Sequence, residues 1–157
     1  MPPLNPKFLL SENLNRLAKW LRLLGYDAAI YKSISTDKMI SLAVKERRII
    51  LTRSRKIAAR KEKFSRILIR SEFHKQQLIE LKDYIGFSEK HLFTRCSECN
   101  KKLVAIAADQ IRNLIPEVIF ASHDEFSICR KCGRIYWPGT HYENIMHELE
   151  DIFRELK

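Results

Sequence analysis

Short apolar runs alternate with amphipathic stretches along the first half of the chain. Four of these runs have the length and the flanking polar residues that are typical of buried strands. Between and after them, apolar side chains recur at helical spacing, which predicts helices with one buried face. The predicted strands span residues 7–10, 28–31, 49–52 and 66–69, and the predicted helices span about residues 14–24, 36–47, 55–63 and 72–84. Strands and helices that alternate with short connections predict an α/β fold, in which helices cover both faces of a parallel sheet.

The pattern changes near residue 91, where the apolar runs become shorter. We expect this part to consist mostly of short strands, with a small helix near Asp109–Leu114. The last segment, Tyr142–Leu156, carries apolar side chains at helical spacing and predicts a C-terminal helix with one face in a core. We therefore predict two domains, an α/β domain over residues 1–90 and a smaller domain with a closing helix over residues 91–157.

The four cysteines form two Cys-x-x-Cys hooks, Cys96 with Cys99 and Cys129 with Cys132, and 29 residues lie between the hooks. Four thiolates complete a tetrahedral zinc site and leave no position for a substrate water, so the spacing predicts a structural zinc ribbon. Gly133 follows the second hook, where glycine suits a tight turn beneath a metal-bound sulfur. The alternative is a redox pair, which would need only one hook.

The composition, with 45% hydrophobic and 31% charged residues, is that of a folded, soluble protein. No apolar run approaches the roughly 18 residues that a membrane-spanning helix needs. The start of the chain, MPPLNPKFLLSENL, lacks the long apolar region of a signal peptide. Zinc-type thiolates without further cysteines suit a reducing compartment. We therefore expect a cytoplasmic protein that does not associate with membranes.

Basic side chains are concentrated in the first part of the chain. Residues 1–90 hold 20 of the 29 Lys and Arg residues but only 9 of the 19 Asp and Glu residues, and Lys45–Arg70 alone carries 11 basic side chains and two acidic ones. Such a charge distribution attracts polyanions, most commonly nucleic acids, because each neutralised phosphate releases counterions. Two alternatives remain open. The basic segment could be a solvated face that only maintains solubility, or a docking surface for an acidic protein partner.

Candidate ligand-binding residues follow the predicted strands, because ligands of an open parallel sheet bind beyond the carboxyl ends of the strands. These positions are rich in hydroxyl groups and helix starts, and they comprise residues 11–13, 33–37, 52–54 and 71–72. Serines there can help to cradle a phosphate, but they are equally ordinary helix caps. Arg53 and Arg55 flank Ser54 and are our first candidates for phosphate contacts. The same patch would be extended by Lys56, Arg60 and Lys61, although solubility explains these cations as well.

Four longer motifs resemble a known protein family. They are FLLSENLNRLAKWLRLLGYD, DKMISLAVKERRIILTRS, RCSECNKKL and CRKCGRIYWPGTHYENI. In this order, from about Lys7 to Ile152, the chain is similar to the Mut-seven C-terminal RNase-domain family. The resemblance implies a PIN-like α/β nuclease fold, with a parallel sheet flanked by helices, followed by a small four-cysteine zinc ribbon and a C-terminal helix.

The resemblance also implies a metal-dependent endoribonuclease that acts in RNA metabolism. PIN-like sites gather carboxylates that hold Mg²⁺ or Mn²⁺, and the ion activates water for attack on the phosphodiester. The family pattern has Asp at the end of the first strand and after the LTR of the third strand, where this chain has Ser11 and Ser54. The acid at the start of the second helix is retained as Asp37, and Glu12 and Glu72 are nearby acids that could take part. The alternative is a catalytically degenerate module that still binds RNA.

The motif after the second hook admits two interpretations. Trp137 could stack on an unpaired base, and His141 could contact a phosphate of the same RNA or move a proton. Alternatively, Trp137 packs inside the ribbon, since small domains have little core and need such contacts.

Overall fold

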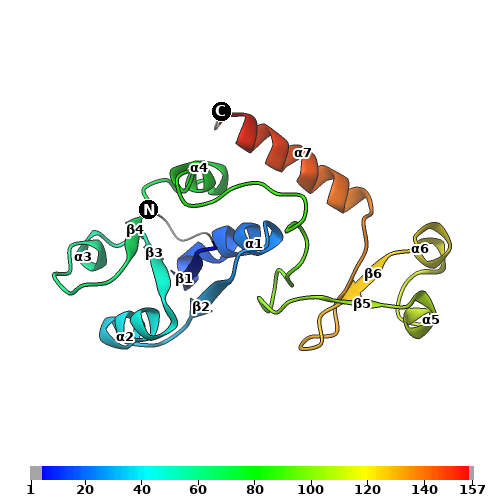
Figure 1. Cartoon of the computed structure of the whole chain (residues 1–157), viewed down its shortest axis with the longest axis horizontal. Coiled ribbons are helices and arrows are strands. Elements are labelled where there is room, and N and C mark those ends of the chain that lie inside the picture. The colour runs from blue at the N-terminus through cyan, green and yellow to red at the C-terminus, as the bar shows by residue number, and fades with distance from the viewer. Residues whose placement is uncertain (1–4, 156–157) are drawn as a thin grey trace. The chain divides into compact units, whose positions relative to one another are not determined.

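The computed structural model describes residues 5–155, whose contacts form two compact units (Figure 1). The first unit ends at Asn100 and the second begins at Lys101. The first cysteine hook therefore belongs, by its contacts, to the unit that contains the parallel sheet. The domain boundary predicted at residue 90 stays a prediction, because a division by contacts does not test which segment folds independently.

A four-stranded parallel sheet with the order β2-β1-β3-β4 forms the centre of the first unit. Its strands are β1 (Lys7–Ser11), β2 (Ala28–Tyr31), β3 (Arg48–Thr52) and β4 (Arg66–Leu68). Leu10 of β1 pairs with Ile30 of β2 on one side and with Leu51 of β3 on the other. The four strands and their parallel arrangement, predicted from the alternation of apolar runs, are confirmed.

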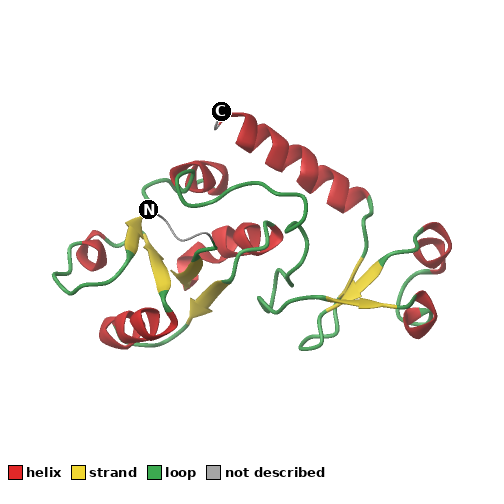
Figure 2. Ribbon diagram, in the orientation of Figure 1, coloured by secondary structure: helices red, strands yellow, loops and turns green. Residues whose placement is uncertain are grey.

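Helices cover both faces of this sheet (Figure 2). They are α1 (Asn15–Leu23), α2 (Thr36–Glu46), α3 (Arg55–Ala58) and α4 (His74–Glu80). Successive residues of a strand point to opposite faces. Leu9 and Ile50 pack against Met39 and Ile40 of α2, whereas the neighbouring Phe8, which is fully buried, points to the face covered by α1 and α4. The predicted α/β class, with a sheet flanked by helices, is confirmed.

The basic helix after β3 is shorter than predicted, since α3 ends at Ala58 and not near residue 63. Beyond it, the guanidinium of Arg66 donates hydrogen bonds to the backbone oxygens of Arg60, at 2.6 Å, and Glu62, at 3.0 Å. These bonds satisfy carbonyl groups that a longer helix would otherwise have paired. The segment between α3 and β4 is therefore a loop held by side-chain bonds.

The helix-cap interpretation of the serines that follow the strands does not hold for Ser11. A short 3-10 helix, η1 (Glu12–Leu14), precedes α1, and the Ser11 side chain makes no capping bond to it. Instead, the Ser11 hydroxyl donates a hydrogen bond of 2.7 Å to Oδ1 of Asn13. The hydroxyl thus donates to a nearby side chain and does not accept a bond from the N–H groups of the helix.

The second unit contains an antiparallel sheet with the order β5-β6-β7. Its elements are β5 (Val104–Ile106), α5 (Ala108–Ile111), α6 (Glu117–Ser122), β6 (Phe126–Ile128), β7 (Ile135–Tyr136) and α7 (Thr140–Glu155). Short strands are present as predicted, but this part does not consist mostly of strands, because α5 and α6 lie between β5 and β6. The helix predicted near residues 109–114 is α5, and α6 follows it after Pro116 without having been predicted. Ile111, Ile115 and Phe126 form the core between these elements.

The C-terminal helix α7 agrees with the predicted apolar stripe, since Ile145, Leu149 and Ile152 are buried. Leu156, which the prediction included, lies outside the described residues. Of the helices within residues 5–155, none combines the length and the apolar character that a bilayer crossing requires.

Candidate functional site

The predicted site residues of the first unit lie where the parallel strands end. Ser11 is the last residue of β1, and Ser54 follows β3 by two residues. These strands are neighbours in the centre of the sheet, and the chain leaves them toward opposite sides, to β2 from β1 and to β4 from β3. Such a change of direction opens a crevice that commonly binds ligands. We call this region the strand-end edge and define it by Ser11–Asn13, Asp37, Thr52–Ser54 and Glu72.

Both serines of the edge are engaged in local hydrogen bonds. The Ser54 hydroxyl accepts a bond of 3.2 Å from the backbone N–H of Ile57, so Ser54 is the N-cap of α3. Its own N–H donates to Oγ1 of Thr52 at 3.0 Å. The helix-cap interpretation of Ser54 therefore agrees with the structure, whereas the Ser11 hydroxyl is bonded to Asn13. Neither serine supplies a negative charge to the edge.

Asp37, the predicted metal ligand, lies in the first turn of α2 and is highly exposed. Its carboxylate forms an ion pair of 2.6 Å with Arg60, one of the predicted RNA-binding residues. Arg60 also pairs with Glu62. The hydrogen bonds from Arg60 lower the pKa of Glu62 from 4.5 to about 2, and the bonds to Glu62 and Asp37 raise the pKa of Arg60. The guanidinium thus connects the loop after α3 with the start of α2.

Glu72 follows β4 and forms a second ion pair, in which its carboxylate lies 3.5 Å from a terminal nitrogen of Arg53. The Nε atom of Arg53 is buried and has no hydrogen-bond partner within residues 5–155. Buried donors in native structures are almost always bonded, so this donor can take an acceptor from outside the protein, whether water or a ligand. Glu12, the third predicted acid, is exposed in η1.

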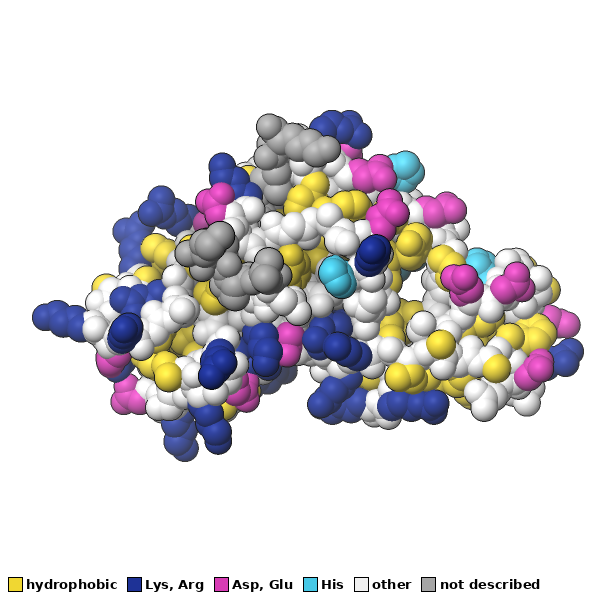
Figure 3. Space-filling view, in the orientation of Figure 1, with side chains coloured by type: hydrophobic (Ala, Val, Ile, Leu, Met, Phe, Trp, Pro, Cys, Tyr) yellow, Lys and Arg dark blue, Asp and Glu magenta, His cyan; other side chains and the backbone are white. Residues whose placement is uncertain are grey.

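The other predicted RNA-binding cations of this unit lie beside the edge. Arg55 and Lys56 are exposed in α3, and Lys61 is exposed in the loop that follows. On the face drawn in Figure 3, Lys and Arg side chains gather over the part of the molecule that carries α2 and α3. The basic segment found in the sequence is therefore also a basic surface in the structure.

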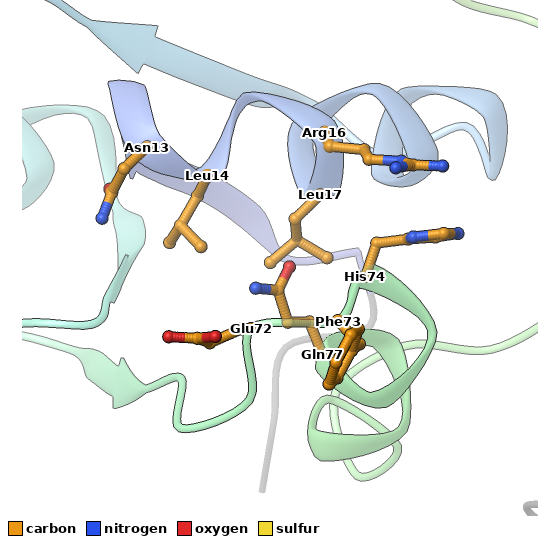
Figure 4. A pocket seen from close by; sticks show the side chains of 8 residues that line it. All are labelled: Asn13, Leu14, Arg16, Leu17, Glu72, Phe73, His74 and Gln77. Carbon is orange, nitrogen blue, oxygen red and sulfur yellow. The ribbon is translucent and has the colours of Figure 1, made fainter.

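A small pocket of about 120 Å³ opens next to the strand-end edge (Figure 4). One wall is formed by η1 and α1, through Leu14, Leu17 and Arg16. The other is formed by the end of the segment between β4 and α4 and by the first turn of α4. Asn13 and Glu72 lie at one end of the pocket, and Arg16 and His74 lie at the other end. The sequence did not indicate this pocket, because its walls are separated by more than 50 residues along the chain.

The four cysteines come together as the spacing predicts. Their Sγ atoms all lie within 4.8 Å of one another, and they are the only group of three or more His, Cys, Asp or Glu side chains in residues 5–155 that is close enough to share an ion. Sulfurs at the corners of a tetrahedral zinc site are about 3.8 Å apart. The donor set and its spacing fit zinc, whereas the acids of the strand-end edge do not form a comparable group.

The two hooks share one backbone conformation. The residue after each hook has a positive φ, 64° at Asn100 and 77° at Gly133. Its N–H donates to the backbone oxygen of the first cysteine, Cys96 at 2.9 Å and Cys129 at 2.8 Å. In the first hook, the N–H of Cys99 also points at Sγ of Cys96, at 3.4 Å. The role predicted for Gly133 is thus shared by Asn100, which the sequence analysis missed although asparagine tolerates this conformation.

Arg22 is a further residue that sequence reasoning missed. Its position on α1 groups it with the polar residues Arg16 and Lys19, yet Arg22 is only 5% exposed. Its guanidinium donates to the backbone oxygens of Ala28, at 2.9 Å, and Ser97, at 2.8 Å. Burial lowers the pKa of Arg22. The side chain ties α1 and β2 to the loop of the first hook.

The amide of Asn100 makes a second connection between the hook and the sheet. Its Oδ1 accepts a bond of 3.0 Å from the N–H of Ala28, and its Nδ2 donates to Asp27 at 2.7 Å. Asp27 in turn pairs with Arg48 at the start of β3, at 2.7 Å. Burial by itself would raise the pKa of Asp27, but the hydrogen bonds from Arg48 and Asn100 outweigh it and lower that pKa. The first hook is therefore part of a polar network that reaches the sheet.

Two predicted RNA-binding residues belong to the second unit. Trp137 packs against the core of Ile111, Ile115 and Phe126, with its ring centroid 6.5 Å from that of Phe126. This contact favours the packing interpretation of Trp137. His141 is exposed at the start of α7. Contacts of either residue with RNA stay predictions.

Comparison with known proteins identifies one family. A family model described as the Mut7-C RNAse domain matches residues 6–149 of the chain. The matched range contains the strand-end edge, the pocket beside it and all four cysteines. A comparison with curated proteins found no match.

Proposed function

Because the chain belongs to the Mut7-C RNAse domain family, which supports an RNase-like function, we propose that it acts in RNA metabolism by binding single-stranded RNA along the strand-end edge. The edge offers hydroxyl groups, arginines and a neighbouring basic surface, which suit a phosphodiester backbone. Base edges and ring faces are accessible only in single strands, whereas a duplex presents mainly its backbone and grooves.

The observation that carries this proposal is the state of Arg53. Its buried Nε has no acceptor within the described residues, and its terminal nitrogen is 3.5 Å from the carboxylate of Glu72, a long contact for an ion pair. A phosphate oxygen would satisfy the free donor and could replace the weak carboxylate contact. Arginine presents its donors in a fixed fork, which suits phosphate better than a single point charge does.

The acids of the strand-end edge support RNA binding better than they support RNA cleavage. Ser11 and Ser54 occupy the two positions where the family pattern has Asp, and the Asp37 carboxylate already pairs with Arg60. Exposed ion pairs contribute only about 0–1 kcal/mol, so Arg60 can exchange its acidic partners for phosphate at little cost. A magnesium ion would instead need these acids together with carboxylates that serines do not provide.

Zinc at the four cysteines would have a structural role in this function. Tetrahedral coordination by four thiolates supplies folding free energy and no reactive water. Through Arg22 and Asn100, the first hook is bonded to α1 and β2, so the bound ion would stabilise the unit that carries the strand-end edge.

A second candidate function is metal-dependent ribonuclease activity, which the family membership favours. In this case Asp37, together with Glu12 or Glu72, would hold Mg²⁺ or Mn²⁺, which would supply charge neutralisation and an activated water. The edge would bind the same substrate in both cases. The two candidates therefore differ in whether the bound RNA is cleaved, and they share the location of the site.

One experiment tests both candidates. The purified protein is titrated with labelled single-stranded RNA at several salt concentrations, and the same RNA is incubated with Mn²⁺ or with EDTA. We expect an affinity that falls steeply with salt, and a slope that decreases by about two phosphate contacts in the double variant Arg53→Ala, Arg55→Ala. Absence of salt-dependent binding would overturn the proposal, and EDTA-sensitive cleavage would favour the second candidate. Docking of an acidic protein partner on the basic segment, and a cytoplasmic location, stay predictions.

A further inference from the structure

Phe73 is the most conspicuous apolar side chain on the surface of the first unit. It is 73% exposed, although it directly precedes α4 and follows Glu72 of the strand-end edge. Leaving such a ring in water forgoes roughly 1.5–3 kcal/mol of burial free energy. An aromatic ring held at a polar, basic edge is therefore a candidate contact for a ligand.

The backbone that carries Phe73 is held in place by side chains. The carboxylate of Glu80 accepts the N–H groups of Arg70, at 2.8 Å, and Ser71, at 2.7 Å. The Ser71 hydroxyl accepts a hydrogen bond of 3.1 Å from the N–H of Phe73. The side-chain amide of the buried Gln77 donates to the backbone oxygen of Ser71 at 2.9 Å. Four bonds within a short segment fix the backbone that carries the ring before any ligand arrives. Such preorganisation lowers the entropic cost of binding.

The pocket beside Phe73 is polar at both ends and apolar along its wall. Figure 4 shows Glu72 directed toward one end, near Asn13, and Arg16 beside His74 at the other end. Leu14 lies between them in the wall. Within residues 5–155, no acidic side chain pairs with Arg16, so its charge is available to an anion.

We propose that Phe73 and this pocket form a stacking site for one unpaired base of single-stranded RNA. The ring of Phe73 packs against the face of the base, Asn13 and Glu72 meet its polar edge, and Arg16 contacts the adjacent phosphate. This inference rests on the proposed function, and it adds a neutral, aromatic component to a surface that otherwise binds by charge. The volume of about 120 Å³ suits a single base and not a folded protein segment.

The chemistry of the site favours a base over other occupants. Aromatic rings bind every base through its π-face, and one such contact is worth about 1–3 kcal/mol. An acyl chain would not benefit from the amide and carboxylate of Asn13 and Glu72, which would lose their hydration. The cation Arg16 and the nearby Arg53 match the phosphates on either side of a stacked nucleotide.

The test measures binding of a short single-stranded RNA that contains 2-aminopurine, whose fluorescence falls on stacking. The variant Phe73→Ala should weaken binding by about ten-fold at every salt concentration, leaving the salt slope unchanged because no charge is removed. Phe73→Trp should restore both the affinity and the fluorescence change. A matched control is Leu114→Ala, which removes another apolar side chain, 69% exposed, from the second unit and should leave binding unchanged. A duplex RNA of the same sequence should bind the wild type and Phe73→Ala with equal affinity.

The outcomes separate this inference from the proposed function. If single-stranded RNA binds with a steep salt dependence and Phe73→Ala binds equally well, the stacking site is refuted and the function stands. If the wild-type protein binds no RNA, both are refuted. If Phe73→Ala weakens single-stranded and duplex RNA alike, the ring has no base-stacking role.

Discussion

The guanidinium of Arg22 donates a hydrogen bond of 2.8 Å to the backbone oxygen of Ser97, inside the loop of the first cysteine hook. A second, longer bond reaches the oxygen of Glu98 at 3.3 Å. Arg22 and Ser97 are 75 positions apart in the chain, and the bond joins helix α1 to the loop between Cys96 and Cys99. The geometry of the hook therefore depends on a side chain of the α/β unit as well as on the thiolates.

Replacing Arg22 should weaken both the fold and metal binding. Arg22→Met leaves backbone oxygens of Ala28 and Ser97 without their partner in a buried place, which should lower the free energy of unfolding by roughly 1–3 kcal/mol. Urea unfolding and the rate of zinc release to a chelator measure the two effects. The control is Lys19→Met, which breaks only an exposed ion pair between Lys19 and Glu98 on the same hook and should cost less than about 1 kcal/mol. Equal effects of the two variants would contradict the buried connection.

The residues that follow the two hooks should respond differently to substitution. At Gly133, a Cβ would meet no atom within 4 Å, so Gly133→Ala should cost only the strain of a positive φ, about 1–2 kcal/mol. Gly133→Asn should cost less, because asparagine adopts this conformation more readily. Asn100→Gly keeps the backbone but removes the bonds to Ala28 and Asp27, and should be destabilising despite the relaxed φ. Thermal unfolding of the zinc-loaded variants measures all three.

Protonation of Glu62 should depend on Arg60. The lowered pKa of about 2, against an ordinary 4.5, means that the ionised form favours the folded state. This contribution is complete above pH 4.5 and is lost as the pH falls through about 2. In a carboxyl ¹³C titration, the pKa of Glu62 should be higher in Arg60→Ala than in the wild type, although the backbone hydrogen bond and the charge of Arg66 still lower it. Lys61→Ala removes a neighbouring charge that has no bond to Glu62, so the pKa of Glu62 should be the same as in the wild type.

Restoring the two missing carboxylates should raise metal-dependent cleavage. We expect the double variant Ser11→Asp, Ser54→Asp to cleave RNA with Mn²⁺ about a hundred-fold faster than the wild type, which corresponds to about 3 kcal/mol of transition-state stabilisation. The α3 cap should survive, since Asp caps helices as well as Ser does. The double variant Ser11→Asn, Ser54→Asn matches the size without the charge and should stay at the wild-type rate. Equal rates in the Asp and Asn variants would mean that more than these ligands is missing.

Loss of one thiolate should unfold the ribbon. Cys129 is buried, and Cys129→Ser removes one of the four thiols that could hold zinc. The variant should therefore bind zinc weakly and unfold at a lower temperature than the wild type. Metal analysis should find about one zinc per chain in the wild type and much less in the variant. A Cys129→Ser protein that unfolds at the wild-type temperature would contradict a structural metal.

Local patterns accounted for most elements of the first unit. The four apolar runs correspond to four parallel strands, because a strand that is buried on both faces is recognisable from a continuous apolar run. The hooks were equally local, since a Cys-x-x-Cys loop brings its two sulfurs together by itself. The end of α3 was not predicted, because it depends on Arg66 reaching the carbonyl groups of the loop. The cap at Ser54 followed from its position, whereas Ser11 bonded Asn13 instead.

The amino-acid sequence by itself determined the α/β order of the elements, the family, the four clustered thiols that could hold a metal ion and the basic character of the first unit, because each is written in residue type and spacing. Only the tertiary structure decided that Arg22 is buried, that Asp37 and Glu72 are paired with arginines, and that Phe73 stands beside a pocket. These facts depend on which distant segments the fold brings together. Periodicity reports how a residue lies on its own element, and it carries no information about the partner that the residue meets.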